Sequence, residues 1–412
     1  MSDVNANAAS PAPVQPVSDE THSLAMAARL DAAIDRALDE QRIVGTVVLV
    51  AHRGQRAYAR AAGFADREAH VAMREDSLFR LASVTKPIVS LAAMRLVEEG
   101  RLALDDAVTK WLPDFTPRLP PGTEGTHETA PRITIHQLLT HTAGLRYGFH
   151  EPPDSPYHRF GISDGIDHVP FDLDENLRRI AQAPLVYAPG TSWRYSVAID
   201  VLGAVLERVT HMTLPQAVEA LVTGPLGMRQ TTFHVPPGTP LVVPYANSST
   251  APVKMHDGMD VFLPPDVGYA VRFSPSRAFD AHAFPSGGGG MIGTAPELLQ
   301  FFETIRTGGA PVVSAETVAL MMKNHVDPSI ETRGPGWGFG YGWGVIHDAA
   351  LAQTPQPAGT IQWGGVYGHT WFVDPVNEFT VVAFTNTAFE GMRGQFSTDV
   401  RDAVYGAAPA VG

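Results

Sequence analysis

The stretch FRLASVTKPIVSLAAMRL, Phe79 to Leu96, places a serine and a lysine three residues apart, Ser83 and Lys86, just ahead of an apolar run. Residues i and i+3 of a helix share one face, so these side chains can touch if the turn is helical. Proline is tolerated in the first helical turn, where its missing N–H has no partner to lose. Pro87 therefore predicts that the helix begins close to Ser83, whose hydroxyl then lies where helix N–H groups favour negative charge.

This pair has the chemistry of a nucleophile and its base. A serine hydroxyl needs a base within hydrogen-bond reach, and a lysine serves as one only when burial lowers its pKa. The residues around Lys86 are apolar and include no nearby acid in sequence. On this pattern alone, however, an N-capping Ser83 followed by a solvated Lys86 is the simpler explanation, because serine caps helices frequently.

A second serine competes for the same role. The segment GISDG, Gly161 to Gly165, fits the G-x-S-x-G pattern of serine hydrolases. That motif needs an apolar strand before the serine and a helix after it. Ser163 follows EPPDSPYHRF and precedes IDHVPFD, which predict neither element. Gly161, Asp164 and Gly165 are more simply interpreted as turn residues.

Composition excludes several classes of function. The 412 residues carry 30 basic and 43 acidic side chains, a net charge of −13, and no basic run, which argues against nucleic acid or an anionic membrane as partner. The absence of cysteine excludes disulfides and thiolate chemistry. The first twenty residues show neither the basic nor the apolar part of a signal peptide. We expect a cytoplasmic protein.

The predicted elements run as helix, two strands, a helical middle, then strands and a closing helix. Short hairpin-like strand pairs favour an antiparallel sheet, so the expected fold class is α/β (α+β) with a sheet flanked by helices. The predicted parts are a disordered N-terminus over 1–21, an α/β domain from 22–82 and 275–412, and an inserted, mainly helical domain over 83–274. A site is expected in the cleft between the two domains.

Two distant motifs extend the first one. Tyr195-Ser196-Val197 begins a predicted helix, and Trp363-Gly364-Gly365 lies on a predicted strand. Ser83-x-x-Lys86 followed by these two motifs resembles the family VIII carboxylesterases, which share the β-lactamase/transpeptidase-like fold of class C β-lactamases and penicillin-binding proteins. The resemblance covers essentially the whole chain after about residue 22.

The resemblance implies specific roles. Ser83 would be the nucleophile that accepts the acyl group, and Lys86 and Tyr195 would form its base system, with Tyr195 as the base and Lys86 lowering the pKa of its phenol. The backbone N–H groups of Ser83 and Val366 would form the oxyanion hole. The residues themselves agree, because a phenol has a pKa near ~10 unless a cation lowers it.

Departures from the β-lactamase pattern bear on the substrate. Trp363 stands where that pattern has the lysine of Lys-Thr-Gly, and Val197 where it has an asparagine. The cation and the amide that would hold a β-lactam are therefore missing, which favours uncharged, short-chain esters. The alternatives on the same fold are β-lactam hydrolysis, D-amino-acid peptide cleavage and acyl transfer, and a non-catalytic sensing module is the alternative from another class.

Further residues are candidates for substrate binding. Tyr147 follows a predicted helix end and is a candidate wall of the pocket. Gly365 lets the backbone approach a substrate carbonyl, and His369 follows the same strand. The segment PSGGGGM, 285–291, lacks the ending of a phosphate loop and suggests close backbone packing near the cleft. We expect no metal and no cofactor, a small-molecule ester as the partner, and draw no conclusion on oligomeric state.

Overall fold

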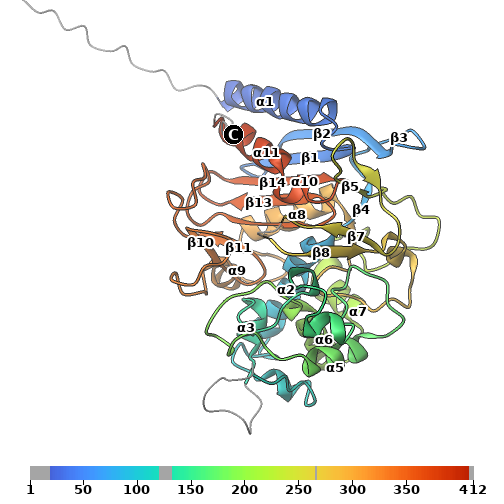
Figure 1. The fold of residues 1–412 in the computed structure, drawn as a ribbon. Helices are drawn as coiled ribbons and strands as arrows, with labels where there is room; N and C mark the ends of the chain where they lie inside the picture. Colours follow the sequence, from blue (N-terminus) through green and yellow to red (C-terminus); the bar gives the residue numbers. More distant parts are fainter. Residues whose placement is uncertain (1–18, 120–131, 265–266, 408–412) are drawn as a thin grey trace, which may run out of the picture.

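The computed structural model describes residues 19–119, 132–264 and 267–407. The predicted disordered segment, 1–21, lies outside the described residues except for its last three, with which helix α1 (Asp19–Asp39) begins. Figure 1 shows a sheet at one end of the molecule and a group of helices at the other. The sequence expectation of an antiparallel sheet flanked by helices is confirmed.

The main sheet has eight described strands in the order β10-β11-β12-β13-β14-β1-β2-β3, and every neighbouring pair is antiparallel. A hairpin turn at Arg53 and Gly54 joins the first two strands, and both residues have a positive φ. The strands are β1 (Gly45–His52), β2 (Gln55–Asp66), β3 (Val71–Ala72), β10 (Trp337–Phe339), β11 (Gly344–Ile346), β12 (Ile361–Gly365), β13 (His369–Asp374) and β14 (Phe379–Thr385).

Both faces of the sheet are covered by helices, which explains the continuous apolar run of β1. Side chains alternate between the faces of a strand. Val48 and Val50 pack in the core beneath α1 and α11 (Gln395–Tyr405), which lie side by side in Figure 1. Val47 and Leu49 point into the other core, on the side of α8 (Ala295–Arg306).

The region between β4 (Leu78–Arg80) and β9 (Ile292–Thr294) holds most of the helices, and these two strands pair with each other at its base. Its helices are α2 (Thr85–Glu98), α3 (Ile135–Leu139), α4 (Pro156–Arg159), α5 (Leu173–Gln182), α6 (Ala198–Thr210) and α7 (Leu214–Val218), with short helical turns η1 (Ala82–Val84), η2 (Val108–Lys110), η3 (Gly148–His150), η4 (Glu219–Thr223) and η5 (Pro275–Phe279). The division into two domains at 82/83 and 274/275 stays a prediction.

Residues 235–290, whose periodicity is weak in the sequence, contain two small hairpins. They are formed by β5 (Tyr245–Ala246) with β6 (Val253–Lys254), and β7 (Met259–Phe262) with β8 (Ala270–Phe273). Two short helices complete the described elements, α9 (Ala315–Met322) and α10 (Glu390–Arg393). None of the helices in the described ranges is long and apolar enough to cross a membrane.

The aromatic run at 337–343 does not form one continuous strand. The chain turns between β10 and β11, which pair with each other as a hairpin. Gly342 in the turn has a φ of +105°, and a Cβ there would lie 2.7 Å from the Ser90 hydroxyl of α2. A side chain would meet both backbone strain and a clash at this point, so glycine lets the hairpin pack against the helix.

Candidate active site

Ser83 lies in the turn η1, directly before α2, as Pro87 predicted. The residue before it, Ala82, has a φ of +45°. L-residues rarely adopt this conformation, and such strained residues cluster at functional sites. The side chain of Ser83 is 9% exposed and lines a cavity of about 410 Å³. A reactive hydroxyl in this position can reach a small molecule in the cavity.

Lys86 is completely buried directly behind Ser83. Its Nζ donates to Ser83 Oγ at 3.3 Å and to the Gly288 carbonyl at 2.6 Å. Burial lowers the pKa of Lys86 to about 7, while Asp200 and Asp164 act in the opposite direction. Lys86 is therefore not the solvated residue of the simpler explanation, and a neutral amine is accessible near neutral pH.

Tyr195 lies beside Lys86, whose Nζ is 4.6 Å from the centre of the phenol ring. Trp363 Nε1 donates to Tyr195 Oη at 3.1 Å, and the two ring centroids are 5.0 Å apart. Burial raises the pKa of Tyr195, and hydrogen bonds with Ser83 and Trp363 lower it. Ser83, Lys86, Tyr195 and Trp363 thus form one connected group.

These pKa directions differ from the roles expected for Lys86 and Tyr195. The expectation is that Lys86 lowers the pKa of the Tyr195 phenol, yet burial dominates and raises it. The same burial lowers the pKa of Lys86. Removal from water disfavours whichever form is charged, the phenolate in one residue and the ammonium in the other. The arrangement favours a neutral amine beside a neutral phenol.

A glycine-rich loop supports Lys86 from below. Asp200 Oδ1 accepts from the Ser286 hydroxyl at 2.6 Å and from the Gly288 N–H at 3.2 Å. A Cβ on Gly288 would lie 2.4 Å from Asp200 Oδ2 and 2.6 Å from Tyr147 Oη. The segment 285–291 therefore serves close backbone packing, and it presents the carbonyl that holds Lys86.

The cavity beside Ser83 is lined by several segments that lie far apart in the sequence, between residues 83 and 393. Trp363 and Val366 line it, and so do residues for which the sequence offered no signal. A Cβ on Gly365 would lie 2.5 Å from the Leu81 carbonyl, so only glycine lets β12 pass directly against η1. This close approach brings Val366 beside Ser83. The remaining lining residues are Phe149, His150, Trp193, Tyr195, Leu263, Val267, Glu331, Thr332, Arg333, Gly364, Met392 and Arg393.

Two expected substrate contacts lie elsewhere. Tyr147 is 2% exposed and packs behind the cavity against Phe149, with its ring centre 5.0 Å from Lys86 Nζ. His369 is 1% exposed, and its Nε2 pairs with the Arg80 carbonyl at 2.9 Å. Burial lowers the pKa of His369 to about 4. Both side chains support the backbone around the site, because neighbouring strands and loops bury them fully.

Ser163, the competing serine, is 1% exposed and does not line this cavity. Its hydroxyl donates to Asp167 and accepts from the Gly165 N–H. Among the described residues no lysine or histidine forms a hydrogen bond with its hydroxyl. The motif GISDG is a turn, as expected, and its glycines at 161 and 165 have positive φ.

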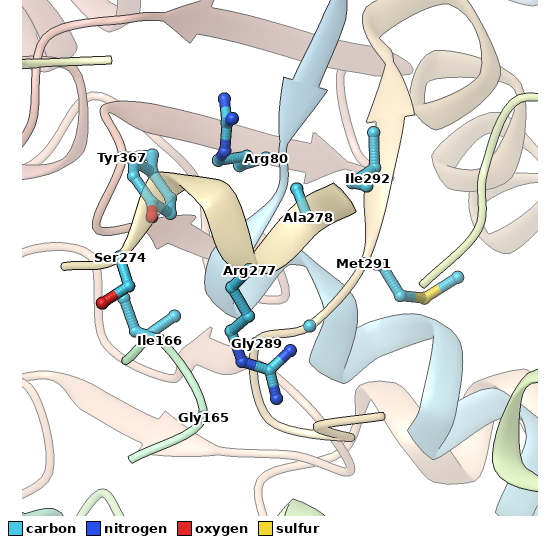
Figure 2. Close-up of a pocket in the computed structure, with 11 residues that line it drawn as sticks. Arg80, Gly165, Ile166, Ser274, Arg277, Ala278, Gly289, Met291, Ile292 and Tyr367 are labelled. Atoms are coloured by element: carbon cyan, nitrogen blue, oxygen red, sulfur yellow. The ribbon is translucent and has the colours of Figure 1, made fainter. Parts of the chain in front are cut away.

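A separate cavity of about 20 Å³ lies behind the glycine-rich loop (Figure 2). Arg80, Arg277, Tyr367 and Gly289 are among its lining residues. The two arginines donate to backbone carbonyls, those of Pro275 and Val242 for Arg80. The volume suits about one water molecule, so this cavity is too small to admit a substrate.

Comparisons with known proteins place this geometry in a family. A model of the beta-lactamase family matches residues 30–405. The chain belongs to the beta-lactamase family. Esterase EstB of Burkholderia gladioli is 54% identical over 395 residues, which span 96% of this chain and 99% of that protein. These findings confirm the resemblance to family VIII carboxylesterases.

Solved structures of two other proteins show the same fold. EstCE1, a hydrolase with promiscuous acyltransferase activity, has a TM-score of 0.90 at 49% identity and covers 93% of this chain and 99% of that chain. A mutant of simvastatin synthase from Aspergillus terreus, 21% identical, has a TM-score of 0.74 over 94% of this chain and 96% of that chain. The expected β-lactamase/transpeptidase-like fold is confirmed.

Sequence reasoning missed Asp200 and Arg333. Asp200 could have been found, because it is an acid on the predicted apolar helix that follows Tyr195. A buried acid in an apolar helix needs a partner and often marks a site. Arg333 lies four residues before the aromatic run that begins at Trp337, and nothing in that stretch indicates that its side chain reaches Trp363.

Proposed function

We propose that the chain is a serine carboxylesterase that hydrolyses short-chain carboxylic esters through an acyl-enzyme on Ser83. The observation that carries this proposal is the fully buried Lys86, whose amine lies 3.3 Å from the hydroxyl of Ser83 at the wall of a 410 Å³ cavity. The ester-hydrolase class is supported by esterase EstB at 54% identity over nearly the whole chain.

In the acylation step, neutral Lys86 takes the hydroxyl proton of Ser83 as Oγ attacks the ester carbonyl carbon. The N–H groups of Ser83 and Val366 stabilise the negative oxygen of the tetrahedral intermediate. The intermediate collapses as the C–O bond to the alcohol breaks. Protonated Lys86 returns the proton through the phenol of Tyr195 to the leaving alcohol oxygen.

Deacylation repeats these steps with water as the nucleophile. Water passes its proton through Tyr195 to neutral Lys86, attacks the acyl carbon and releases the carboxylic acid, and Ser83 regains its proton. Trp363 holds the phenol in place by its hydrogen bond to Oη. The two half-reactions balance, because the proton of Ser83 goes to the alcohol and the proton of water returns to Ser83.

The test compares p-nitrophenyl butyrate with the chromogenic cephalosporin nitrocefin, using the wild type and Ser83→Ala. We expect hydrolysis of the ester that depends on Ser83 and little or no turnover of nitrocefin. If nitrocefin were turned over faster than p-nitrophenyl butyrate, the enzyme would be a β-lactam hydrolase and not an esterase. Failure of an active-site-serine phosphonate to label the wild type would contradict the acyl-enzyme.

Acyl transfer to an alcohol is a second candidate. It is favoured by the likeness to EstCE1, a hydrolase with promiscuous acyltransferase activity that is 49% identical and covers 93% of this chain. The same acyl-enzyme would react with an alcohol in place of water. Adding methanol to the ester assay and measuring methyl butyrate against butyrate detects this reaction.

A further inference from the structure

Arg333 is a cation at the wall of the active-site cavity with no acidic partner among the described residues. Its guanidinium carbon lies 4.8 Å from the ring centre of Trp337 and 5.9 Å from that of Trp363. No carboxylate lies within ion-pair distance of Arg333 in the described ranges. A guanidinium packed on aromatic faces keeps its N–H edge free for a second partner.

The position of this cation differs from what the sequence indicates. With Trp363 in place of a lysine, the sequence suggests that the cavity lacks a cation for an anionic substrate. The fold brings Arg333 from another loop onto the same indole ring, whose Nε1 is bonded to Tyr195. The indole ring of Trp363 therefore lies between the phenol of Tyr195 and the positive charge of Arg333.

The surroundings of Arg333 favour an anion. Arg333 is exposed at the surface of the protein, yet the atoms packed around its guanidinium lower its pKa, and the charges of Arg393, which lines the same cavity, and Arg401 act in the same direction. Glu331 is the carboxylate among the lining residues, and it is exposed. His150 also lines the cavity, and burial lowers its pKa to about 4, so it is neutral at pH 7. An anion bound to Arg333 would offset the positive charge of its guanidinium.

We propose that Arg333 forms a carboxylate-binding subsite, and that the enzyme prefers esters whose acyl chain ends in a carboxylate, the monoesters of short dicarboxylic acids. This inference rests on the proposed esterase function. The cavity of about 410 Å³ contains both Ser83 and Arg333 on its wall, so one small ester can reach both. Phe149, Leu263 and Met392 provide apolar surface for the methylene chain between the two groups.

The test measures kcat/KM for monomethyl adipate and for methyl hexanoate, which have acyl chains of equal length, in a pH-stat at pH 7.5. We expect Arg333→Gln to lower kcat/KM for the anionic ester by about 10- to 100-fold, the value of a charge-assisted hydrogen bond, and to change the neutral ester by less than about twofold. Arg333→Lys restores part of the loss, because lysine keeps the charge but not the paired donors.

Two further variants sharpen the test. Glu331→Gln removes the opposing charge and should raise kcat/KM for monomethyl adipate alone. Arg101→Gln is the matched control, an exposed arginine that pairs with Glu99 away from the cavity, and it should change neither ester. The preference of the wild type should weaken as the salt concentration rises.

The outcomes separate the two proposals. An equal loss for both esters in Arg333→Gln would show that the arginine only shapes the wall, and equal rates in wild type and variant would show that no subsite exists. Either result overturns the subsite and leaves the esterase intact. Failure of the wild type to cleave methyl hexanoate and p-nitrophenyl butyrate would overturn the esterase itself.

Discussion

The turn around Ser83 and the turn around Ser163 carry two serine motifs with opposite outcomes. Ser83 lies beside a buried amine at the wall of a cavity. Ser163 is buried, and its hydroxyl is committed as donor to Asp167 and as acceptor from Gly165. A nucleophile needs a free path to the substrate and a base for its proton. A serine in a hydrolase-like motif is therefore reactive only where the fold places a base and an open cavity beside it.

The second turn still serves the site indirectly. Asp164 accepts from the backbone N–H groups of Gly148 and Phe149 at 2.7 and 2.9 Å. These bonds hold the turn η3, which supplies Phe149 and His150 to the cavity wall. One serine motif thus positions a reactive hydroxyl, and the other belongs to a loop that shapes the space in front of it.

Exchanging each serine for alanine should produce the largest contrast. Ser83→Ala is expected to lower kcat for p-nitrophenyl butyrate by at least about 10³-fold, because no acyl acceptor remains. Ser163→Ala should keep kcat within about threefold and lower the free energy of unfolding by about 1–3 kcal/mol, since Asp167 loses a buried partner. The measurements are ester hydrolysis and urea unfolding of both variants. The reverse pattern of activities would assign the chemistry to Ser163.

Lys86→Met tests the base of the proposed mechanism. The unbranched apolar side chain fills similar space in a buried site but cannot accept a proton. We expect kcat/KM to fall by about 10²–10⁴-fold, the usual contribution of general base catalysis. Arginine at position 86 should not restore activity, because a guanidinium stays protonated. Retention of most activity in Lys86→Met would mean that Tyr195 acts alone.

The pH profile of the wild type follows from the lowered pKa of Lys86, about 7. The amine is a base only when it is neutral, so kcat/KM should fall as the pH drops through about 7 and reach a plateau above it. Asp200→Asn removes a negative charge that raises the pKa of Lys86, so the acidic limb should move to lower pH. Asparagine keeps an acceptor for Ser286 and Gly288.

The control for this shift is Asp174→Asn, an exposed acid that pairs with Arg208. Its profile should coincide with that of the wild type. An Asp200→Asn profile that moves to higher pH, or does not move while the protein stays folded, would contradict the electrostatic role of Asp200 toward Lys86.

Trp363→Phe should have the smallest effect. It keeps an aromatic ring against Tyr195 but removes the hydrogen bond from Nε1 to the phenol. We expect kcat to fall by about 2- to 10-fold, as for the loss of one neutral hydrogen bond, with KM nearly unchanged. Pre-steady-state release of p-nitrophenol separates acylation from deacylation. A larger rise in KM than loss in kcat would make Trp363 a substrate contact.

Local sequence patterns were sufficient to predict several parts of the site. Pro87 predicts a helix start near Ser83, because a proline is tolerated in the first turn. The absence of strand and helix around Ser163 excludes it for an equally local reason. Two-residue turns and alternating strands predict the hairpins of the sheet, and the order of three short motifs indicates the family. Each of these inferences depends on neighbours along the chain.

The surroundings of these parts follow from how the chain folds. The burial of Lys86, the Asp200–Gly288 support beneath it and the raised pKa of Tyr195 arise from segments that lie far apart in the sequence. The turn at Gly342 packs directly against Ser90 of α2, a contact between segments about 250 residues apart. Arg333 reached Trp363 through folding alone. The burial of a side chain and the charges around it depend on all its neighbours in space, and a sequence pattern shows only its neighbours along the chain.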